Sequence, residues 1–301
     1  ENENMSVFTG SAVAIVTPFH NDADQTVNYD AFAELLDFQI ENGTDAIVVC
    51  GSTGESATMS EEEHLEVCRF AVDYVKHRVP VIAGTGSNCT KTAANLTEAI
   101  RGYGADAALV ITPYYNKGTQ EGLYQHFRAV AEAGRGIPVL MYNVPSRTGV
   151  NLLPETVARL VREVPDIVGI KEACGDLSQI VKLMTLTDGK IDLYSGNDDQ
   201  TVPIMAMGGL GVISVVANVV PKKMHDLCAA FQAGDLAAAR ALQLETEELF
   251  ECLFSEVNPI PVKKAVSLMG FAAGPLRLPL TEMTPAKAEK MAEAMKKLGV
   301  L

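Results

Sequence analysis

The segment Gly104-Ala-Asp-Ala-Ala-Leu-Val-Ile-Thr-Pro-Tyr-Tyr-Asn116 contains the pattern that predicts the fold of this chain. A glycine ends a helical stretch, a short apolar run follows it, and polar and aromatic residues come directly after the run. Such runs are typical of parallel strands that are buried on both faces. The related segment Gly43-Thr-Asp-Ala46 lies two β–α units of about 30 residues each towards the amino terminus, so the pattern repeats.

Eight such runs occur along the chain, and longer amphipathic stretches separate them. Ser60 and Glu63 form a predicted capping box, and Pro154 and Pro221 stand where a first helical residue belongs. Eight strands that alternate with helices predict a closed (β/α)8 barrel, although an open doubly wound sheet has the same alternation. No dinucleotide-binding or P-loop motif follows a strand. The runs are 11–17, 46–49, 81–84, 107–111, 139–142, 167–171, 191–195 and 211–215.

The strand pattern stops near residue 233, and helical sequence rich in Ala and Leu follows it. The break at Asn258-Pro-Ile-Pro261 falls within this part, for which we expect three helices. We therefore predict a catalytic barrel over residues 5–234 and a C-terminal helical domain over residues 235–301. Residues 1–4 precede a methionine and are expected to be a remnant of cloning.

Composition limits the classes of partner. The chain has 301 residues, of which 48% are hydrophobic and 21% are charged, as is typical of a globular protein. No apolar run approaches the ~20 residues of a membrane helix, and the first residues do not resemble a signal peptide. The net charge of −14 disfavours nucleic acid and anionic membranes as partners. We expect a cytoplasmic protein that binds neither.

The six cysteines, at positions 50, 68, 89, 174, 228 and 252, include no CxxC pair and no metal-ligand spacing. We expect reduced, mostly buried thiols that pack as small hydrophobic side chains. Most of the five histidines fall in or before predicted helices, whereas a catalytic zinc site needs imidazoles gathered at the strand ends. We therefore predict neither a metal nor an organic cofactor.

Lys171 is the candidate nucleophile. A β/α barrel places its active site at the carboxyl ends of its strands, and Lys171 ends the sixth run. Burial disfavours the charged form of a lysine, and a neutral amine attacks a ketone to form a Schiff base. The alternative is a strand-end ion pair with Glu172 or another neighbour, and position alone favours neither.

Other strand ends supply hydroxyl groups and anion receptors. Tyr142 ends the neighbouring run and, with Thr53 and Tyr115, suits a proton relay, although a tyrosine there can also be a core aromatic residue. The segment Gly51-Ser-Thr-Gly54 can turn backbone N–H groups toward a carboxylate, or can simply be a tight turn. Arg147 can bind a carboxylate through its guanidinium fork, or can be solvated.

Together these motifs resemble the dihydrodipicolinate synthase family over nearly the whole chain. The family pattern usually has two threonines in the Gly-rich turn, where this chain has Ser52 and Thr53, and serine keeps the hydroxyl group. The order and spacing of the motifs carry the resemblance. They include Phe8-Thr-Gly10, Gly51-Ser-Thr-Gly-Glu-Ser-Ala57, Val81-Ile-Ala-Gly-Thr-Gly86, Thr112-Pro-Tyr-Tyr-Asn116, Tyr142-Asn-Val-Pro-Ser-Arg-Thr-Gly149, Gly169-Ile-Lys-Glu172 and Asn258-Pro-Ile-Pro-Val-Lys263.

The resemblance implies condensation of pyruvate with L-aspartate 4-semialdehyde, the first committed step of diaminopimelate and lysine biosynthesis, in a homotetramer built as a dimer of dimers. By the family pattern, Lys171 carries the pyruvate imine and Arg147 receives the carboxylate of the semialdehyde. Tyr115 reaches into the site of a partner subunit. In the same pattern, the proton relay consists of Tyr142, Thr53 and Tyr115. The backbone amides of Ser52 and Thr53 bind pyruvate. Gly196 and Ile213 line the pocket.

The resemblance also implies a cleft for L-lysine at a dimer interface. Two of its positions depart from the pattern of lysine-sensitive relatives, because Thr92 stands where such relatives often have a glutamate and Glu61 stands where some have a histidine. A polar interface without an effector is therefore an equal alternative. The cleft positions are Ser56, Ala57, Glu61, His64, Asn88, Thr92 and Tyr114.

Two other functions compete with this interpretation. N-acetylneuraminate lyases and keto-deoxy sugar-acid aldolases share the lysine, the tyrosine and the Gly-rich turn, but Arg147 suits the carboxylate of a small amino acid. A non-catalytic barrel that binds a small acid would use Arg147 and would not need Lys171.

Overall fold

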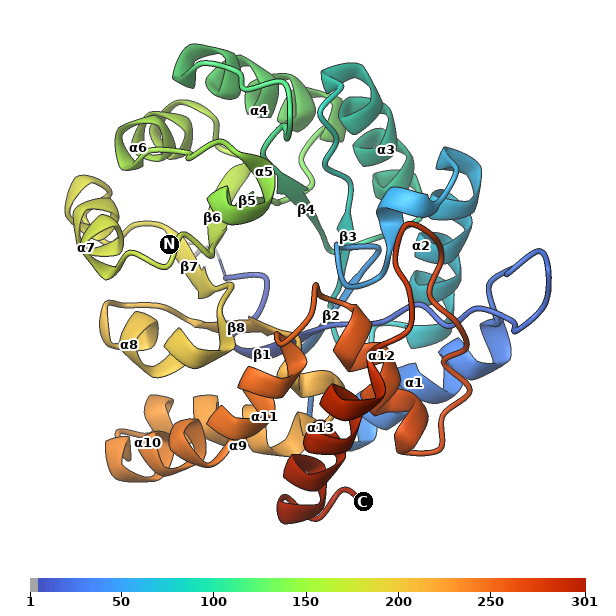
Figure 1. Cartoon of the computed structure of the whole chain (residues 1–301). Coiled ribbons are helices and arrows are strands. Elements are labelled where there is room, and N and C mark those ends of the chain that lie inside the picture. Colours follow the sequence, from blue (N-terminus) through green and yellow to red (C-terminus); the bar gives the residue numbers. More distant parts are fainter. Residues whose placement is uncertain (1–4) are drawn as a thin grey trace.

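The eight strands form a closed parallel barrel in the order β1 to β8, so the open-sheet alternative is excluded. The computed structural model describes residues 5–301, and the expected remnant at residues 1–4 lies outside them. Figure 1 looks along the barrel with the helices arranged around it. The strands are β1 (Gly10–Ala14), β2 (Ala46–Val49), β3 (Val81–Gly84), β4 (Ala107–Ile111), β5 (Val139–Asn143), β6 (Ile167–Glu172), β7 (Asp192–Ser195) and β8 (Gly211–Ser214).

Helices connect the strands and form the outer layer. Gly43 and Gly104, with φ of 86° and 87°, adopt the left-handed conformation after two of them, as the repeated motif predicts. The capping box forms only in part, because Ser60 Oγ accepts from the Glu63 amide at 3.1 Å while the Glu63 carboxylate binds Arg277. The helices are α1 (Tyr29–Glu41), α2 (Glu61–Val75), α3 (Thr90–Gly102), α4 (Gln120–Gly134), α6 (Pro154–Glu163), α7 (Leu177–Leu186), α8 (Thr201–Ala206) and α9 (Pro221–Gln232), with short segments η1 (Ser56–Thr58), α5 (Pro145–Thr148), η2 (Asp198–Gln200) and η3 (Val216–Asn218).

Small and branched side chains fill the interior of the barrel. Along a strand, every second side chain points into the barrel, as Leu140 and Tyr142 do on β5. On β6 the same alternation gives Gly169, Lys171 and Ala173 the inward direction and gives Glu172 the outward one. The strand register pairs Lys171 with Tyr142 on one side and with Tyr194 on the other. The lysine therefore stands at the mouth of a packed barrel.

The C-terminal part contains four helices rather than the expected three. They are α10 (Leu236–Glu245), α11 (Glu247–Leu253), α12 (Ile260–Leu268) and α13 (Pro285–Lys297). Thr246 ends α10 and precedes α11, at a point where no proline or glycine marks the break. Helix α10 packs on α9, and Leu249 and Met291 join the same hydrophobic core as the outer helices of the barrel. The division at residues 234 and 235 stays a prediction.

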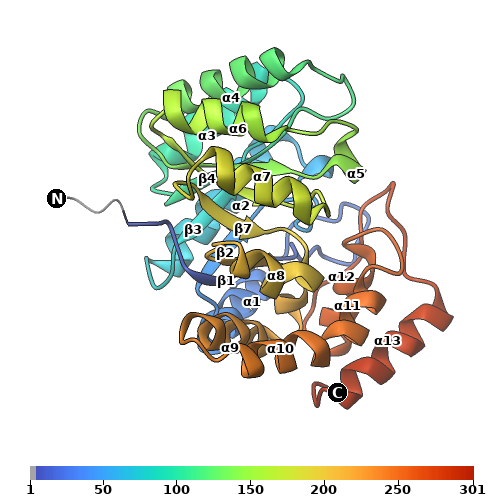
Figure 2. The same cartoon turned by 90° about the vertical axis from the view of Figure 1, so that its left-hand side faces the viewer.

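Helices α11, α12 and α13 lie at the same end of the molecule as α5, which follows β5 (Figure 2). This end is the carboxyl end of the strands, so the C-terminal helices border the mouth of the barrel. Within residues 5–301, no helix is long and apolar enough to cross a bilayer.

Candidate active site

Lys171 is buried at the end of β6 and has no acidic partner. Its side chain is 7% exposed, and Nζ lies 4.1 Å from the centroid of the Tyr142 ring. Among residues 5–301, no side chain forms an ion pair or a hydrogen bond with Nζ. The amine is therefore not committed to an ion pair or a hydrogen bond within the described chain.

Glu172, the suspected ion-pair partner, faces the other side of β6. Asn143 Nδ2 donates to Glu172 Oε1 at 3.0 Å, and the Cys174 amide donates to the same oxygen at 2.9 Å. Burial raises the pKa of Glu172 to about 7, although these donors act in the opposite direction. Strand alternation thus separates the adjacent acid from Lys171, and the proposed ion pair does not form.

The Gly-rich turn after β2 presents two backbone N–H groups. The carbonyl of Ser52 accepts from the Glu55 amide at 3.1 Å, and Thr17 Oγ1 donates to the carbonyl of Gly54 at 2.8 Å. The amides of Ser52 and Thr53 donate to no acceptor in the described part of the chain. Two free amides in one turn suit a carboxylate ligand.

Asn258 links the Gly-rich turn to the loop after β5, and the sequence did not indicate this role. Its Nδ2 donates to Thr53 Oγ1 at 2.9 Å, and its carbonyl accepts from Arg147 Nη1 at 3.2 Å. Its own Oδ1 is buried and has no partner in the described residues. The Asn-Pro-Ile-Pro break was the available signal, but a break in helical sequence does not reveal which side chains meet.

The three relay residues are not joined by hydrogen bonds within the described chain. Thr53 is buried and bound to Asn258, and Tyr142 is 9% exposed. Tyr115 is 86% exposed and has a left-handed φ of 76°, which is unusual for a residue other than glycine. Its amide donates to the carbonyl of Thr148 at 3.1 Å, so the loop after β4 is held against α5. The relay stays a prediction.

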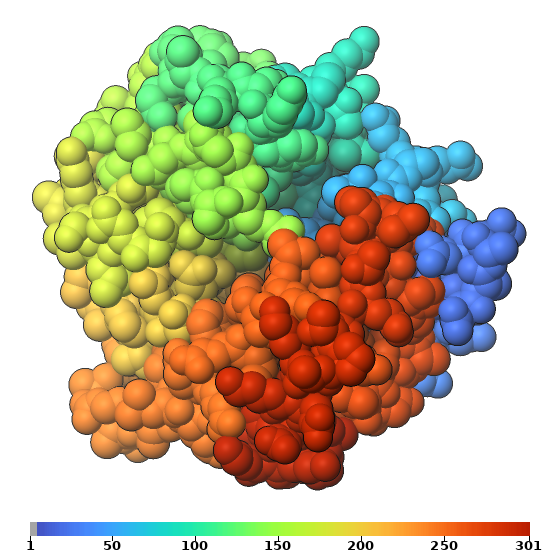
Figure 3. Space-filling view, in the orientation of Figure 1, coloured from blue at the N-terminus to red at the C-terminus, as the bar shows by residue number. Residues whose placement is uncertain are grey.

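Gly196 directly follows β7 and Ile213 lies on β8, and their role as pocket walls stays a prediction. A Cβ atom on Gly196 would lie 2.8 Å from Ala173 Cβ and 3.1 Å from Lys171 Cγ, so a side chain there would displace the lysine. Ile213 belongs to the barrel interior together with Tyr142. Figure 3 shows the surface hollowed between the green segments around α5 and the orange-red C-terminal segments.

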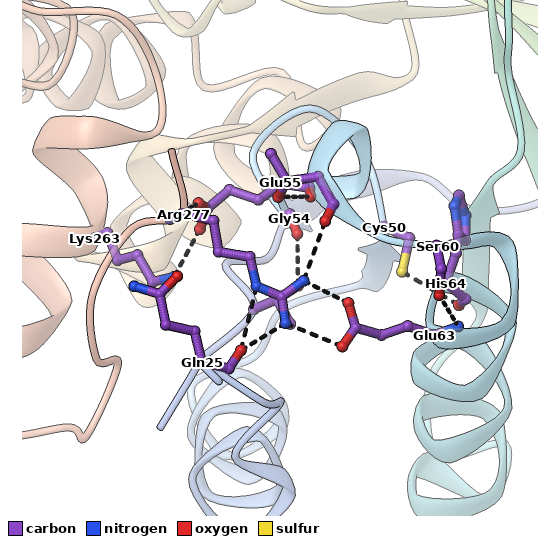
Figure 4. A network of polar contacts seen from close by, with 11 residues as sticks. Gln25, Cys50, Gly54, Glu55, Ser60, Glu63, His64, Lys263 and Arg277 are labelled. Carbon is purple, nitrogen blue, oxygen red and sulfur yellow. Dashed lines mark hydrogen bonds and ion pairs between the residues drawn. The ribbon is translucent and has the colours of Figure 1, made fainter. Parts of the chain in front are cut away.

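A buried ion pair supports the Gly-rich turn from the C-terminal side. Lys263 Nζ on α12 lies 2.6 Å from Glu55 Oε2, and the side chains are 2% and 1% exposed. The amide of Arg277 donates to Glu55 Oε1 at 3.1 Å, and its guanidinium binds Glu63 and the carbonyl of Gln25 (Figure 4). These contacts fix the connection between β2 and α2 to the C-terminal helices.

The positions of the implied L-lysine cleft lie on adjacent connections after β2, β3 and β4. His64 differs from the others because it is buried, and its Nε2 lies 2.6 Å from the carbonyl of Gly84. Glu61 and Ala57 are exposed. The remaining positions are half-buried or at the surface, namely Ser56, Asn88, Thr92 and Tyr114. The cleft stays a prediction.

Comparison with known proteins agrees with this geometry. The model of the dihydrodipicolinate synthetase family matches residues 7–298. A 4-hydroxy-tetrahydrodipicolinate synthase of Lachnoclostridium phytofermentans is 55% identical over 297 residues, which cover 99% of this chain and 100% of the relative. A chloride-inhibited dihydrodipicolinate synthase from Acinetobacter baumannii, solved with pyruvate, is 45% identical with a TM-score of 0.94, covering 97% of this chain and 99% of that chain. The enzyme from Cyanidioschyzon merolae, solved with lysine bound, is 38% identical with a TM-score of 0.95, covering 99% and 100% of the two chains.

The barrel and the buried lysine at its mouth define the class of protein, a lyase of the class I aldolase type. Identity of this level over whole chains is far above what the fold alone requires. The chain belongs to the dihydrodipicolinate synthetase family.

Proposed function

We propose that the protein condenses pyruvate with L-aspartate 4-semialdehyde to give 4-hydroxy-tetrahydrodipicolinate and water, the first committed step of diaminopimelate and lysine biosynthesis. The observation that supports this most is the amine of Lys171, which forms no ion pair in the described chain and is buried beside Tyr142 and Gly196 at the carboxyl ends of the strands. The names of the full-length relatives agree with the same reaction. A barrel that only binds an acid has no use for such an amine.

Lys171 begins the reaction. Its neutral amine attacks the C2 carbonyl of pyruvate, and loss of water from the carbinolamine gives an iminium ion. The pyruvate carboxylate lies on the free amides of Ser52 and Thr53. The iminium ion withdraws electrons, so a C3 methyl proton is lost and an enamine forms. Tyr142, whose ring lies against the Lys171 amine, is the candidate to move these protons through its hydroxyl.

The enamine then forms the new carbon–carbon bond. Its C3 attacks the aldehyde carbon of the semialdehyde, and the resulting alkoxide takes a proton. The amino group of the semialdehyde attacks C2 and displaces the Lys171 amine, which closes the six-membered ring and releases the enzyme. One water is released overall, and no metal or organic cofactor takes part.

Arg147 selects the second substrate. Among the described residues, its guanidinium donates only through Nη1, to the carbonyl of Asn258 at 3.2 Å. The rest of the fork is open to the carboxylate of the semialdehyde at the exposed side of the mouth. Sugar acids carry hydroxyl groups where the semialdehyde carries this carboxylate and its amine, so the arginine favours the smaller substrate.

A coupled assay with pyruvate and L-aspartate 4-semialdehyde, beside a cleavage assay with N-acetylneuraminate, tests this proposal. We expect condensation and no cleavage of the sialic acid. Cleavage of N-acetylneuraminate without condensation would assign the chain to another member of the superfamily instead.

We also propose that the active unit is a homo-oligomer, a tetramer built from two dimers. The exposed Tyr115 on its left-handed backbone suits insertion of the ring into the site of a second copy. Sedimentation of the protein at several concentrations, with Tyr115→Phe assayed beside it, tests both points. A fully active monomer would contradict them.

L-lysine inhibition is proposed to be weak. Thr92 lacks the carboxylate that would pair with a ligand ammonium group, and Glu61 supplies one on the neighbouring helix start. Titration of L-lysine at several pyruvate concentrations, with Thr92→Glu as the matched variant, tests this. Stronger inhibition of the variant supports the cleft, and no inhibition of either protein at millimolar lysine contradicts it.

A further inference from the structure

Three side chains that can bind a metal gather behind the Gly-rich turn. Cys50 follows β2, while His64 and Cys68 lie one turn apart on α2. All three are buried, and their ligand atoms lie within 4.8 Å of one another. This differs from the expectation that the cysteines form no metal-ligand group, because only the fold brings the end of β2 against this face of α2.

The His64 ring is oriented as in many metal sites. Its Nε2 lies 2.6 Å from the carbonyl of Gly84, so Nε2 is the donor and Nδ1 is the ring nitrogen left to bind a metal. Nδ1 is then the ring nitrogen that a metal held by Cys50 and Cys68 would use. Histidines that bind metals commonly donate their other ring N–H to a carbonyl in this way. Figure 4 shows His64 and Cys50 together, with Cys50 Sγ 3.7 Å from the His64 carbonyl.

The composition of the cluster suits a thiophilic cation. Two cysteine sulfurs and one imidazole nitrogen lie together in a buried place, and these are ligands that zinc prefers. The nearby Glu63 does not add an oxygen ligand, because its carboxylate is bound to Arg277. A bound divalent cation would be balanced by the two cysteines in their thiolate form.

We propose that Cys50, His64 and Cys68 bind one thiophilic cation, for which Zn²⁺ is the probe. Two sulfurs and one nitrogen form a ligand set that zinc accepts and that Mg²⁺ and Ca²⁺ do not. A tetrahedral zinc ion with Zn–S bonds of about 2.3 Å holds two sulfurs roughly 3.8 Å apart. The cluster therefore needs only a small contraction, and the fourth position is left to a small ligand such as water.

The bound cation would have a structural effect at this place. It would tie the end of β2 to α2, directly before the turn that carries Ser52 and Thr53. Cys50 already adopts a left-handed φ of 55°, and the metal bond would hold it there. The site is distinct from Lys171, so the cation stabilises the turn and supplies no catalytic metal.

Zinc content and affinity test the proposal. The chain is produced in cells supplied with zinc, so that loading does not depend on access through the folded shell, and is purified in a thiol-free reductant. Elemental analysis should give one zinc per chain, and competition with a chromogenic chelator should give an affinity that Cys50→Ala and Cys68→Ala each lower by roughly 100-fold or more. Cys228→Ala removes an equally buried thiol on α9 and should keep the zinc. A zinc-free wild type, or equal zinc in Cys68→Ala, would overturn the proposal.

Cobalt substitution gives a second measurement that needs no variant. Wild-type protein loaded with Co²⁺ should show near-ultraviolet thiolate-to-cobalt absorption with the intensity of two thiolates. Absence of this band would contradict the site. Mapping of unreduced peptides from the zinc-supplied protein is the remaining check, and a disulfide between Cys50 and Cys68 in place of metal would also overturn the proposal.

Discussion

Two lysines of this barrel are buried, and the difference between their surroundings distinguishes a structural lysine from a catalytic one. Lys263 is 1% exposed and Lys171 is 7% exposed. Each ammonium nitrogen lies over an aromatic ring, 3.9 Å from the centroid of Phe19 and 4.1 Å from that of Tyr142. Lys263 forms a 2.6 Å ion pair with Glu55, whereas Lys171 has no acidic partner in the described chain.

This contrast shows what each lysine can do. The pair between Lys263 and Glu55 joins α12 to the connection after β2, and removal of either partner would leave a buried charge uncompensated. Lys171 forms no ion pair within the described chain, so its amine is not tied to a structural partner and can react with a ketone. Groups that are unfavourable for stability and are nevertheless kept are typical of functional sites.

The largest expected effect follows from Lys171→Met. Loss of the imine-forming amine should lower kcat/KM by about 10³-fold or more. Because no acidic partner is left behind, the free energy of unfolding should stay within about 1 kcal/mol of wild type. The coupled assay and urea denaturation measure the two quantities. Near-normal activity, or a large loss of stability, would remove the contrast between the lysines.

Lys263→Met should have the opposite profile. Breaking a buried ion pair from one side typically costs about 3–5 kcal/mol of stability. The double variant Lys263→Met with Glu55→Gln is the matched control, because glutamine still accepts from the Arg277 amide without a charge. It should recover part of the loss in urea denaturation. A single variant as stable as wild type would mean that the pair contributes nothing.

The same contrast applies to two arginines. The guanidinium of Arg277 is bound to Glu63 and to backbone carbonyls, whereas the guanidinium of Arg147 donates, within residues 5–301, only to the carbonyl of Asn258. Arg147→Ala should remove a charge-assisted bond of about 1.5–3 kcal/mol, which is roughly 10- to 150-fold in KM for the semialdehyde. Imine formation with pyruvate should not change. Loss of the imine with an unchanged KM for the semialdehyde would show that the role is wrong.

Glu172→Gln should change how the stability of the protein depends on pH. Burial raises the pKa of Glu172 to about 7 in the folded chain, so its protonated form stabilises the fold. This contribution is full below about pH 4.5 and is lost as the pH rises through 7. Glutamine remains neutral and still accepts from Asn143, so the variant should be more stable than wild type by about 1–2 kcal/mol at pH 8. Urea denaturation at pH 5 and pH 8 measures the difference, and parallel curves would contradict it.

The sequence predicted the parts of this structure that local patterns encode. All eight strands start within one residue of the predicted apolar runs, and six starts coincide, because a strand buried on both faces must be apolar throughout. Lys171 was found as a candidate because it interrupts such a run at its end. Whether Lys171 forms an ion pair with Glu172 could not be predicted from the sequence, and the register of β6 decided it.

Contacts between distant segments were not predicted. Asn258 meets Thr53 from 205 positions away, and Arg277 takes the Glu63 carboxylate that the capping box would have used. The cluster of Cys50 with His64 and Cys68 has no local signature for the same reason. Periodicity specifies which face of an element is buried, but it does not specify which side chain of another element meets that face.

Borohydride trapping with pyruvate tests the central claim most directly. Reduction of the imine should attach one reduced pyruvate per chain, and peptide mapping should place it on Lys171. Lys263 is the informative competitor, because burial lowers its pKa to about 8 and so raises its share of neutral amine. A label on Lys171 alone is the predicted result. A stable adduct on Lys263, or on any lysine other than Lys171, would contradict the account.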